Sequence, residues 1–412
     1  TMANIKPGQL FLLELDKILA KKPGEISIIN LVDKLVQYGY AARSSDIHIE
    51  PAEGKVLVRL RIDGILKDSF SFPTELQSEV ITRIKVLSGL KTDIHHIPQD
   101  GRFKAKIEEV GDVDIRVSIA PTYYGENSVM RILAEALQVF TLEDLGFTDE
   151  QLKIVNRAIQ KPYGMLLANG PTGSGKTTTL YTMIKKLNTR EVSIITIEDP
   201  IEYSLQGITQ MPLNVQAGLT FANGLRSILR QDPNVIMVGE VRDSETASIA
   251  VNAALTGHLM LSTLHTNDAA TTFPRLIDMG VPPFLVASTV NIVIAQRLVR
   301  VACTKCRKER TLSLAEVKSL SKTLKDMIVE RVFTVGKGCD ECGDTGYKSR
   351  IGIHEVLEVD DEIRNLIVSH ADAGVIKSTA MKLGMKTMIV DGLMKAQSGV
   401  TTIEEILRII YE

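Results

Sequence analysis

The sequence has few aromatic residues and no excess of charge of either sign. It contains no Trp, and Phe, Trp and Tyr together make up 5% of its 412 residues. The chain therefore has few side chains on which nucleic-acid bases could stack. Lys and Arg number 48 against 50 Asp and Glu, so the chain lacks the strongly basic surface on which non-specific nucleic-acid binding rests. These two absences argue against nucleic acid as an obligatory partner.

Long apolar runs are scarce as well. The uncharged stretches 204–225 and 279–296 are interrupted by Pro, Asn, Gln, Ser and Thr, so neither is a continuous membrane span. The apolar run Phe11–Leu13 is followed at once by Glu14, which is not the pattern of a signal peptide. A cytoplasmic, reducing location is therefore expected. Because Thr1 precedes Met2, native N-terminal sequence is expected to be missing.

The composition is that of a soluble globular protein, and the length suggests two to four domains. We expect a leader over residues 1–25 and an α+β domain over residues 26–134, because strand-like and helix-like patterns are mixed there without regular alternation. Asp63-Gly64 is a hairpin turn signal. The predicted helices are 26–40 and 75–90, and the predicted strands are 46–50, 56–62, 102–107, 113–119 and 129–133.

The second part of the chain has a different pattern. After a linker over 135–147, residues 148–300 alternate between strand and helix patterns, which predicts an α/β domain with a parallel sheet. Its short, continuous apolar runs are typical of strands buried on both faces. These runs are 165–168, 192–197, 235–238 and 259–263. A Cys-bearing module is expected over 301–352 and a helical region over 353–412.

The strongest local signal is a phosphate-binding loop. Residues 170–177 read Gly-Pro-Thr-Gly-Ser-Gly-Lys-Thr, between an apolar strand and a helix. The glycines let backbone N–H groups surround phosphates, Lys176 would reach the β- and γ-phosphates, and Thr177 would hold Mg²⁺. The predicted nucleotide contacts are Gly170, Pro171, Thr172, Gly173, Ser174, Gly175, Lys176, Thr177 and Thr178.

Two buried strands run into carboxylates. Val235–Val238 leads through Gly239 to Glu240, and Ile194–Ile197 leads to Glu198. After a phosphate-binding loop, such residues are candidates for facing Mg²⁺ or for accepting a proton from the attacking water. Spacing leaves open which of Glu198 and Glu240 is the base.

Two histidines flank another predicted strand, 259–263. His258 precedes it and His265 follows it, and His265 is placed to hydrogen-bond a γ-phosphate. A structural role is the alternative for both, since a single histidine is more often a satisfied structural residue than a site residue.

The four cysteines form two pairs, Cys303-x-x-Cys306 and Cys339-x-x-Cys342. This spacing can supply four thiolates to a tetrahedral zinc in a closed, structural site. A disulfide is a poor alternative in a reducing compartment. The 32 residues between the pairs, 307–338, need an insert, and 314–330 fits a helix.

Arginines accompany the carboxylate strands. Phosphoryl transfer needs positive charge on the γ-phosphate, often from a second domain or subunit, whereas ordinary surface ion pairing is the alternative for any single arginine. The candidates are Arg116, Arg131, Arg226, Arg230 and Arg242.

These segments together resemble the secretion ATPase family, the ATPases of type II secretion and type IV pilus systems. The resemblance rests on four boxes in the second half, on four motifs before them and on three features after them. The boxes are GPTGSGKTTTLY, ITIEDPIEY, LRSILRQDPNVIMVGEVRD and LTGHLMLSTLHTNDA. The earlier motifs are SSDIHIEP, RLRIDG, PQDGRF and VDIRVSIAPTYYGENSVMRIL, and the later features are QRLVR, the Cys pairs and GIHEVLEV. The chain departs from the family pattern at Asp93–Ile97, where a charged stretch is expected, and the larger N-terminal docking domain of many members is not among these residues.

The resemblance implies a hexameric ring of subunits with a RecA-like P-loop domain and a smaller, PAS-like N-terminal α+β domain that caps ATP. It places Glu198 in the family's Asp box, Glu240 in its Walker B box, and His258 and His265 in its His box. The five arginines occupy family positions for contacting phosphate across a closing cleft.

The implied function is ATP-driven assembly of pili or pseudopili, with an inner-membrane platform protein as partner and no direct insertion into the membrane. The alternatives are a retraction motor of the same family, a nucleic-acid motor, and a nucleotide-binding scaffold without hydrolysis. The four-Cys insert argues against retraction, and the carboxylate strands argue against the scaffold.

Overall fold

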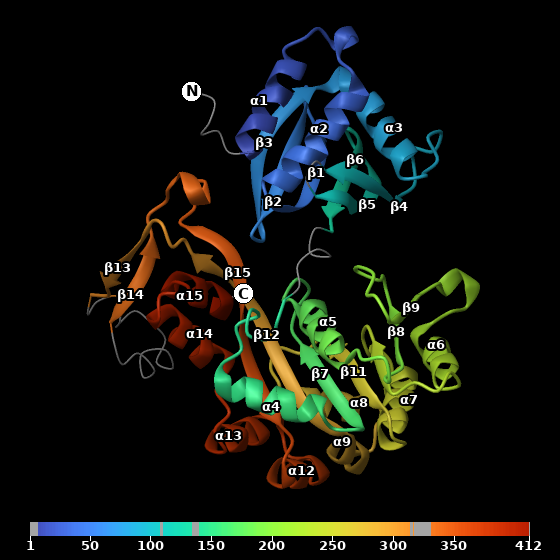
Figure 1. The fold of residues 1–412 in the computed structure, drawn as a ribbon, viewed down its shortest axis with the longest axis vertical. Coiled ribbons are helices and arrows are strands. Elements are labelled where there is room, and N and C mark those ends of the chain that lie inside the picture. Colours follow the sequence, from blue (N-terminus) through green and yellow to red (C-terminus); the bar gives the residue numbers. More distant parts are fainter. Residues whose placement is uncertain (1–6, 108–109, 134–139, 314–315, 317–330, 412) are drawn as a thin grey trace. The chain divides into compact units, whose positions relative to one another are not determined.

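A computed structural model describes residues 7–107, 110–133, 140–313, 316 and 331–411. The chain divides into two compact units, Thr1–Gln138 and Val139–Glu412 (Figure 1). Each unit has its own buried apolar core and is described by itself.

The first unit is built on a six-stranded antiparallel sheet in the order β3-β2-β1-β6-β5-β4. The strands are β1 (Ser44–Ala52), β2 (Lys55–Ile62), β3 (Ile65–Pro73), β4 (Gln99–Ile107), β5 (Gly111–Thr122) and β6 (Gly125–Ile132). The helices are α1 (Pro7–Leu19), α2 (Ile28–Ala41) and α3 (Gln77–Leu87), with short 3-10 turns at Pro23–Glu25 and Thr74–Leu76.

Part of the segment expected to be a leader belongs to this core. Residues 7–19 form α1, whose Leu15 and Ile18 are buried with Leu31 and Leu35 of α2. The apolar positions of α1 recur at helical spacing, so one face of the helix can be buried.

The second unit contains a seven-stranded sheet in the order β15-β12-β7-β11-β10-β8-β9. All neighbouring strands are parallel except β12 and β15, which are antiparallel. The strands are β7 (Gly164–Asn169), β8 (Ile194–Glu198), β9 (Thr209–Pro212), β10 (Val235–Val238), β11 (Leu259–Leu264), β12 (Val290–Ala302) and β15 (Tyr347–Glu358). The four central strands β7, β8, β10 and β11 are buried along their whole length, which confirms the α/β fold class.

One helix precedes these strands, and the others lie between them or after them along the chain. They are α4 (Asp149–Ile159), α5 (Lys176–Leu187), α6 (Phe221–Ile228), α7 (Ser244–Leu255), α8 (Thr272–Asp278) and α9 (Pro283–Thr289), then α12 (Asp361–Val368), α13 (Ala373–Lys382), α14 (Met388–Gln397) and α15 (Ile403–Tyr411). Short 3-10 turns occur at Val215–Ala217 and Asp340–Cys342. A two-stranded ribbon, β13 (Arg307–Thr311) and β14 (Val332–Gly336), lies between β12 and β15 in the chain.

The segment boundaries drawn from sequence differ from these elements at three points. The boundary at residue 300 falls inside β12 and the boundary at 352 falls inside β15, since these long strands pair with each other through Arg300 and Arg350. The cysteine segment is therefore inserted between two strands of the main sheet. In the range expected to be a linker, Leu142 and Phe147 are buried in the second unit. The helix expected at 314–330 lies outside the described residues.

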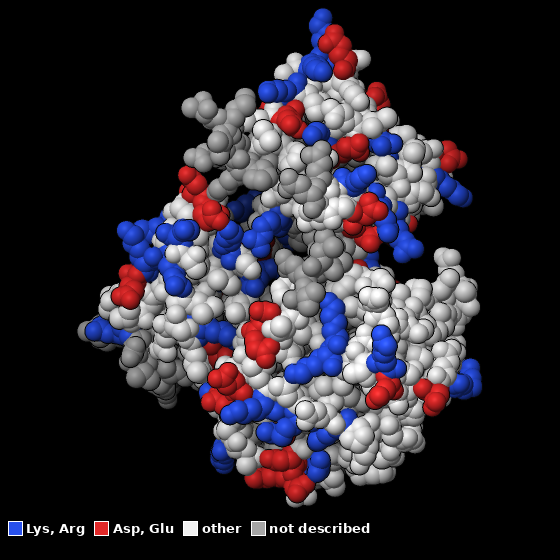
Figure 2. Space-filling model, in the orientation of Figure 1, with Lys and Arg blue, Asp and Glu red and all other residues white. Residues whose placement is uncertain are grey.

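Within the residues that the structure describes, no helix is long and apolar enough to cross a membrane. Side chains of both charge signs are spread over the face seen in Figure 2.

Candidate ATP-hydrolysing site and four-cysteine cluster

The phosphate-binding loop joins the end of β7 to the start of α5. All three of its glycines have positive φ angles, +141° at Gly170, +79° at Gly173 and +89° at Gly175, which residues with side chains rarely adopt. A Cβ on Gly170 would also lie 2.5 Å from the carbonyl oxygen of Gln296. Gly175 is the N-cap of α5, so the first N–H groups of this helix open toward the loop. The local geometry is that of an anion-binding turn.

Lys176 closes the loop from its C-terminal end. Its Nζ donates to the carbonyl oxygens of Gly170 at 2.7 Å and Pro171 at 3.0 Å. Burial lowers the pKa of Lys176 below its ordinary value, although the charge of Glu240 opposes that shift. The ammonium group is thus held next to the loop, where it interacts electrostatically with the Glu240 carboxylate.

Gln296 of β12 forms hydrogen bonds with the loop and with the helix after it, although it is not among the site residues predicted from the sequence. Its buried side chain donates from Nε2 to the carbonyl oxygen of Ser174 at 2.8 Å and accepts from the Thr179 hydroxyl at 2.9 Å. An unmade hydrogen bond at a buried group costs about 1–3 kcal/mol, so Gln296 fixes the loop conformation. The sequence signal that could have identified Gln296 is its place as the first residue of the QRLVR segment.

Glu240 lies just beyond β10, held by two cationic or polar partners. Its Oε1 accepts from Arg242, and its Oε2 lies 3.1 Å from Nε2 of His265. Burial disfavours the Glu240 carboxylate, but the hydrogen bonds and charges of Arg242 and His265 outweigh it and bring the pKa below the usual value. Because β10 and β11 are parallel neighbours, the residues after each strand meet at one edge of the sheet. Glu240 is therefore an ionised carboxylate that keeps access to solvent.

Glu198, the last residue of β8, has a different environment. It is 2% exposed, and both of its carboxylate oxygens accept hydrogen bonds. Tyr181 donates to Oε2, Thr196 donates to Oε1 at 2.6 Å, and Gln210 donates to Oε1 at 3.2 Å. Burial raises the pKa of Glu198 above its usual value despite these donors. Its lone pairs are already engaged within the protein.

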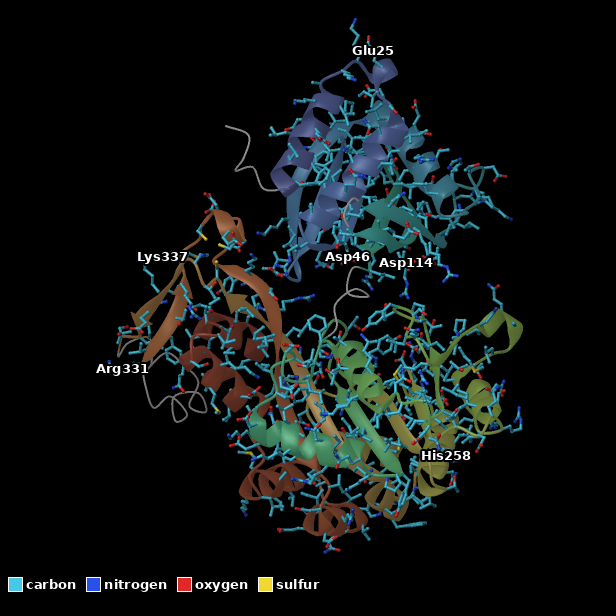
Figure 3. All side chains as sticks on the ribbon, viewed as in Figure 1. Glu25, Asp46, Asp114, His258, Arg331 and Lys337 are labelled. Atoms are coloured by element: carbon cyan, nitrogen blue, oxygen red, sulfur yellow. The ribbon has the colours of Figure 1, made fainter. Side chains whose placement is uncertain are left out.

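The structure does not bring His258 to the phosphate-binding loop. Its carbonyl oxygen accepts from the N–H of Gly164, the first residue of β7, whereas the loop follows the last residue of that strand. Nδ1 of His258 lies 3.0 Å from the carbonyl oxygen of Ala253 (His258 is labelled in Figure 3). His258 and His265 thus lie at opposite ends of β11, as expected for residues that flank one strand.

The predicted arginines divide between the two units. Arg242 contacts Glu240, as described above. Arg226 of α6 donates to Glu245 at 2.6 Å, and Arg230 donates to the carbonyl oxygen of Arg226 at 2.9 Å. Neither contact joins these two residues to the loop.

In the first unit, Arg116 of β5 and Arg131 of β6 are paired in register. Nε of Arg131 donates to the buried carboxylate of Asp46 at 2.9 Å (Asp46 is labelled in Figure 3). The expected contact of both arginines with phosphate stays a prediction.

The four cysteines meet in one cluster, with all four sulfur atoms within 4.8 Å of one another. The Sγ atoms of Cys303 and Cys339 are 3.8 Å apart, and those of Cys306 and Cys342 are 3.9 Å apart. A tetrahedron of Zn–S bonds of about 2.3 Å has edges of about 3.8 Å, so the spacing fits zinc.

The chemistry of the cysteine cluster also suits a metal. Burial opposes ionisation of Cys342, but N–H groups of Cys339 and Gly346 donate to its sulfur at 3.3 and 3.2 Å. These and neighbouring thiol contacts lower the pKa of Cys342 to about 6. The thiolate is the form that binds metal.

A glycine-rich turn between a buried parallel strand and a helix, with carboxylates at the ends of two neighbouring strands, is the arrangement of a P-loop nucleotide-binding protein with a RecA-like fold. Residues 21–408 match the family described as type II/IV secretion system protein. The chain belongs to this family.

Curated relatives agree with that membership. The chain is 46% identical over 395 residues to the type IV pilus assembly ATPase PilB of Thermus thermophilus, covering 96% of the chain and 43% of that protein. It is 46% identical over 386 residues to the type II secretion system protein E of Xanthomonas campestris, covering 93% of the chain and 68% of that protein. The chain thus spans less than half of the first relative and about two thirds of the second.

Solved structures share the fold. The pilus retraction motor PilT with bound ADP is 26% identical with a TM-score of 0.63, covering 92% of the chain and 96% of that protein. The ATPase DotB of Legionella pneumophila is 22% identical with a TM-score of 0.69, covering 95% and 98%, and it supports the fold alone.

Proposed function

We propose that the chain hydrolyses ATP and is the motor part of a type IV pilus assembly or type II secretion system. The observation that carries this proposal is Glu240, a solvent-accessible carboxylate with a lowered pKa beside Arg242 and His265, on the same sheet as the phosphate-binding loop. Names of relatives at 46% identity supply the biological setting.

In this proposal the loop amides and Lys176 bind the phosphates of ATP. Thr177, half-buried in the first turn of α5, is suitably placed to hold Mg²⁺, which neutralises phosphate charge when bound. Glu240 accepts a proton from the attacking water, while His265 and Arg242 fix its orientation. Glu240 is preferred to Glu198 as the base because Glu198 is enclosed at 2% exposure, whereas the Glu240 side chain is 13% exposed and can meet an attacking water.

The wider assembly is proposed from the family. Six chains form a ring, and the first unit brings Arg116 and Arg131 to the ATP of the second unit. Arg226 and Arg230 add positive charge when the ring closes. The ring works in the cytoplasm on an inner-membrane platform protein, with zinc bound by the four cysteines as a structural ion.

Assembly is preferred to retraction within this family. The curated relatives at 46% identity are named for pilus assembly and secretion, whereas the retraction motor is 26% identical.

The test is steady-state phosphate release by the chain and by Lys176→Ala and Glu240→Gln. Circular dichroism is the folding control for both variants, and binding of a fluorescent ATP analogue is a second control for Glu240→Gln. Both substitutions are expected to lower turnover at least about tenfold, because each removes a group that acts on the transferring phosphoryl or the water. Near-normal turnover in both variants would contradict the proposal.

A further inference from the structure

The loop that carries His265 continues into a turn closed by its own polar groups. Thr266 donates from its hydroxyl to the carbonyl oxygen of Asp268 at 3.1 Å, and the carboxylate of Asp268 accepts from the N–H of Thr271 at 2.9 Å. The loop then enters α8. Asp268 is three residues from His265 in this closed turn, so the backbone that carries the imidazole next to Glu240 leads directly into the residues that Asp268 fixes.

One side of this turn is fixed to the phosphate-binding strand. Asn169, the last residue of β7, donates from Nδ2 to the Thr266 hydroxyl at 2.7 Å and also to the Thr272 hydroxyl. The Asn169 side chain is fully buried. The loop that carries His265 is therefore hydrogen-bonded to β7, the strand that leads into the phosphate-binding loop.

The other side is fixed to the C-terminal region, more than eighty residues away in sequence. Lys377 of α13 donates to Oδ2 of Asp268 at 2.9 Å, and its Nζ lies 3.9 Å from Oε2 of Glu355 in β15. Glu355 is 1% exposed and accepts from the N–H of Ala269 at 3.0 Å. Lys377 and Glu355 thus each form a hydrogen bond with one of two adjacent residues of the turn, Asp268 and Ala269.

This cluster is a poor source of stability. The Lys377 and Asp268 side chains are 34% and 23% exposed, and ion pairs that are open to solvent contribute little to the stability of a fold. Burial of Glu355 raises its pKa, so its ionised form is held at a cost. The role of these contacts is therefore better explained as fixing the position of the turn than as stabilising the fold.

We infer that Lys377, with Glu355, is a positioning residue for ATP hydrolysis: it holds Asp268 and Ala269 so that His265 reaches Glu240. This inference rests on the proposed ATPase function. It makes α13 a point from which a movement of the C-terminal helices changes turnover without touching the nucleotide.

The experiment compares kcat, KM and ATP-analogue affinity for Lys377→Met, Lys377→Arg, His265→Ala and the double variant His265→Ala/Lys377→Met. Lys382→Met is the matched control, since Lys382 is an exposed lysine on the same helix. Lys377→Met is expected to lower kcat about tenfold, because a small misplacement of a reacting group is costly. Analogue affinity and melting temperature stay close to those of the parent chain. Lys377→Arg keeps the charge and restores most of the turnover.

The double variant separates positioning from a general structural effect. If Lys377 acts through His265, adding Lys377→Met to His265→Ala lowers kcat no further. Additive losses, an unchanged kcat in Lys377→Met, or an unchanged kcat in His265→Ala would overturn the inference. In each of these cases Lys176→Ala and Glu240→Gln still lower turnover at least about tenfold, whereas failure of the ATPase proposal itself is recognised by near-normal turnover of both of these variants.

Discussion

Glu198 ends β8 and Glu240 lies just beyond the neighbouring parallel strand β10, yet their surroundings shift their pKa values in opposite directions. Glu240 has a cationic guanidinium and an imidazole against it and keeps solvent access, so its charged form is favoured. Glu198 is enclosed, and burial outweighs its three donors. At residue scale, two carboxylates that the sequence presents as equivalent candidates are suited to different roles.

The raised pKa of Glu198 makes a stability prediction. A carboxyl group whose pKa is higher in the folded state than its ordinary value of 4.5 lowers the free energy of unfolding as pH rises above 4.5. The reason is that the unfolded state then ionises more readily than the folded state. Glu198→Gln removes this loss. We expect the stability of the variant relative to the parent chain to increase as pH rises above 4.5, since only the parent chain must then hold or ionise a buried carboxyl group. Urea unfolding across that range measures it.

Glu191→Gln, at an exposed position before β8, is the control for that experiment. A free-energy difference between Glu198→Gln and the parent chain that does not change with pH would show that Glu198 ionises normally.

At the scale of elements, the sequence predicts what is encoded locally. The strand–loop–helix of the phosphate site and the buried strands β7, β8, β10 and β11 are visible as short patterns. The contacts of Gln296 with Ser174 and of Glu355 with Ala269 bridge 122 and 86 residues, so only the folded sheet reveals them. The strand extensions of β12 and β15 were missed for the same reason: their pairing crosses the cysteine segment.

The cysteine cluster carries the prediction at this scale. Chain purified without chelator should contain about one zinc, and Cys306→Ser/Cys342→Ser should remove it. Structural zinc contributes several kcal/mol, and about 1 kcal/mol shifts Tm by about 2–4 °C in a domain of this size, so loss of zinc lowers Tm by more than about 5 °C. Metal analysis and thermal unfolding measure both effects. A metal-free chain with an unchanged Tm would contradict the assignment.

At the scale of the whole molecule, two units share one chain, and the arginines expected to act on phosphate are divided between them. A unit that supplies charge to a nucleotide held elsewhere works only when units or subunits come together. The chain's balance of charges, apparent in its composition and on the face in Figure 2, suits close packing of subunits rather than a polyanionic partner.

Turnover is therefore predicted to depend on assembly. Phosphate released per chain should rise with protein concentration and level off as a species of six chains forms, measured by light scattering under the same conditions. Lys176→Ala serves as the control for contaminating ATPases. Turnover per chain that is constant while the chain stays monomeric would contradict the ring.

The most direct test of the central claim is a single-turnover measurement of ATP cleavage with enzyme in excess, comparing the parent chain, Glu240→Gln and Glu198→Gln. The account predicts that Glu240→Gln binds ATP but cleaves it at least about a hundredfold more slowly, while Glu198→Gln stays within a few-fold of the parent rate. Equal rates for the parent chain and Glu240→Gln, or a larger loss in Glu198→Gln, would contradict the account.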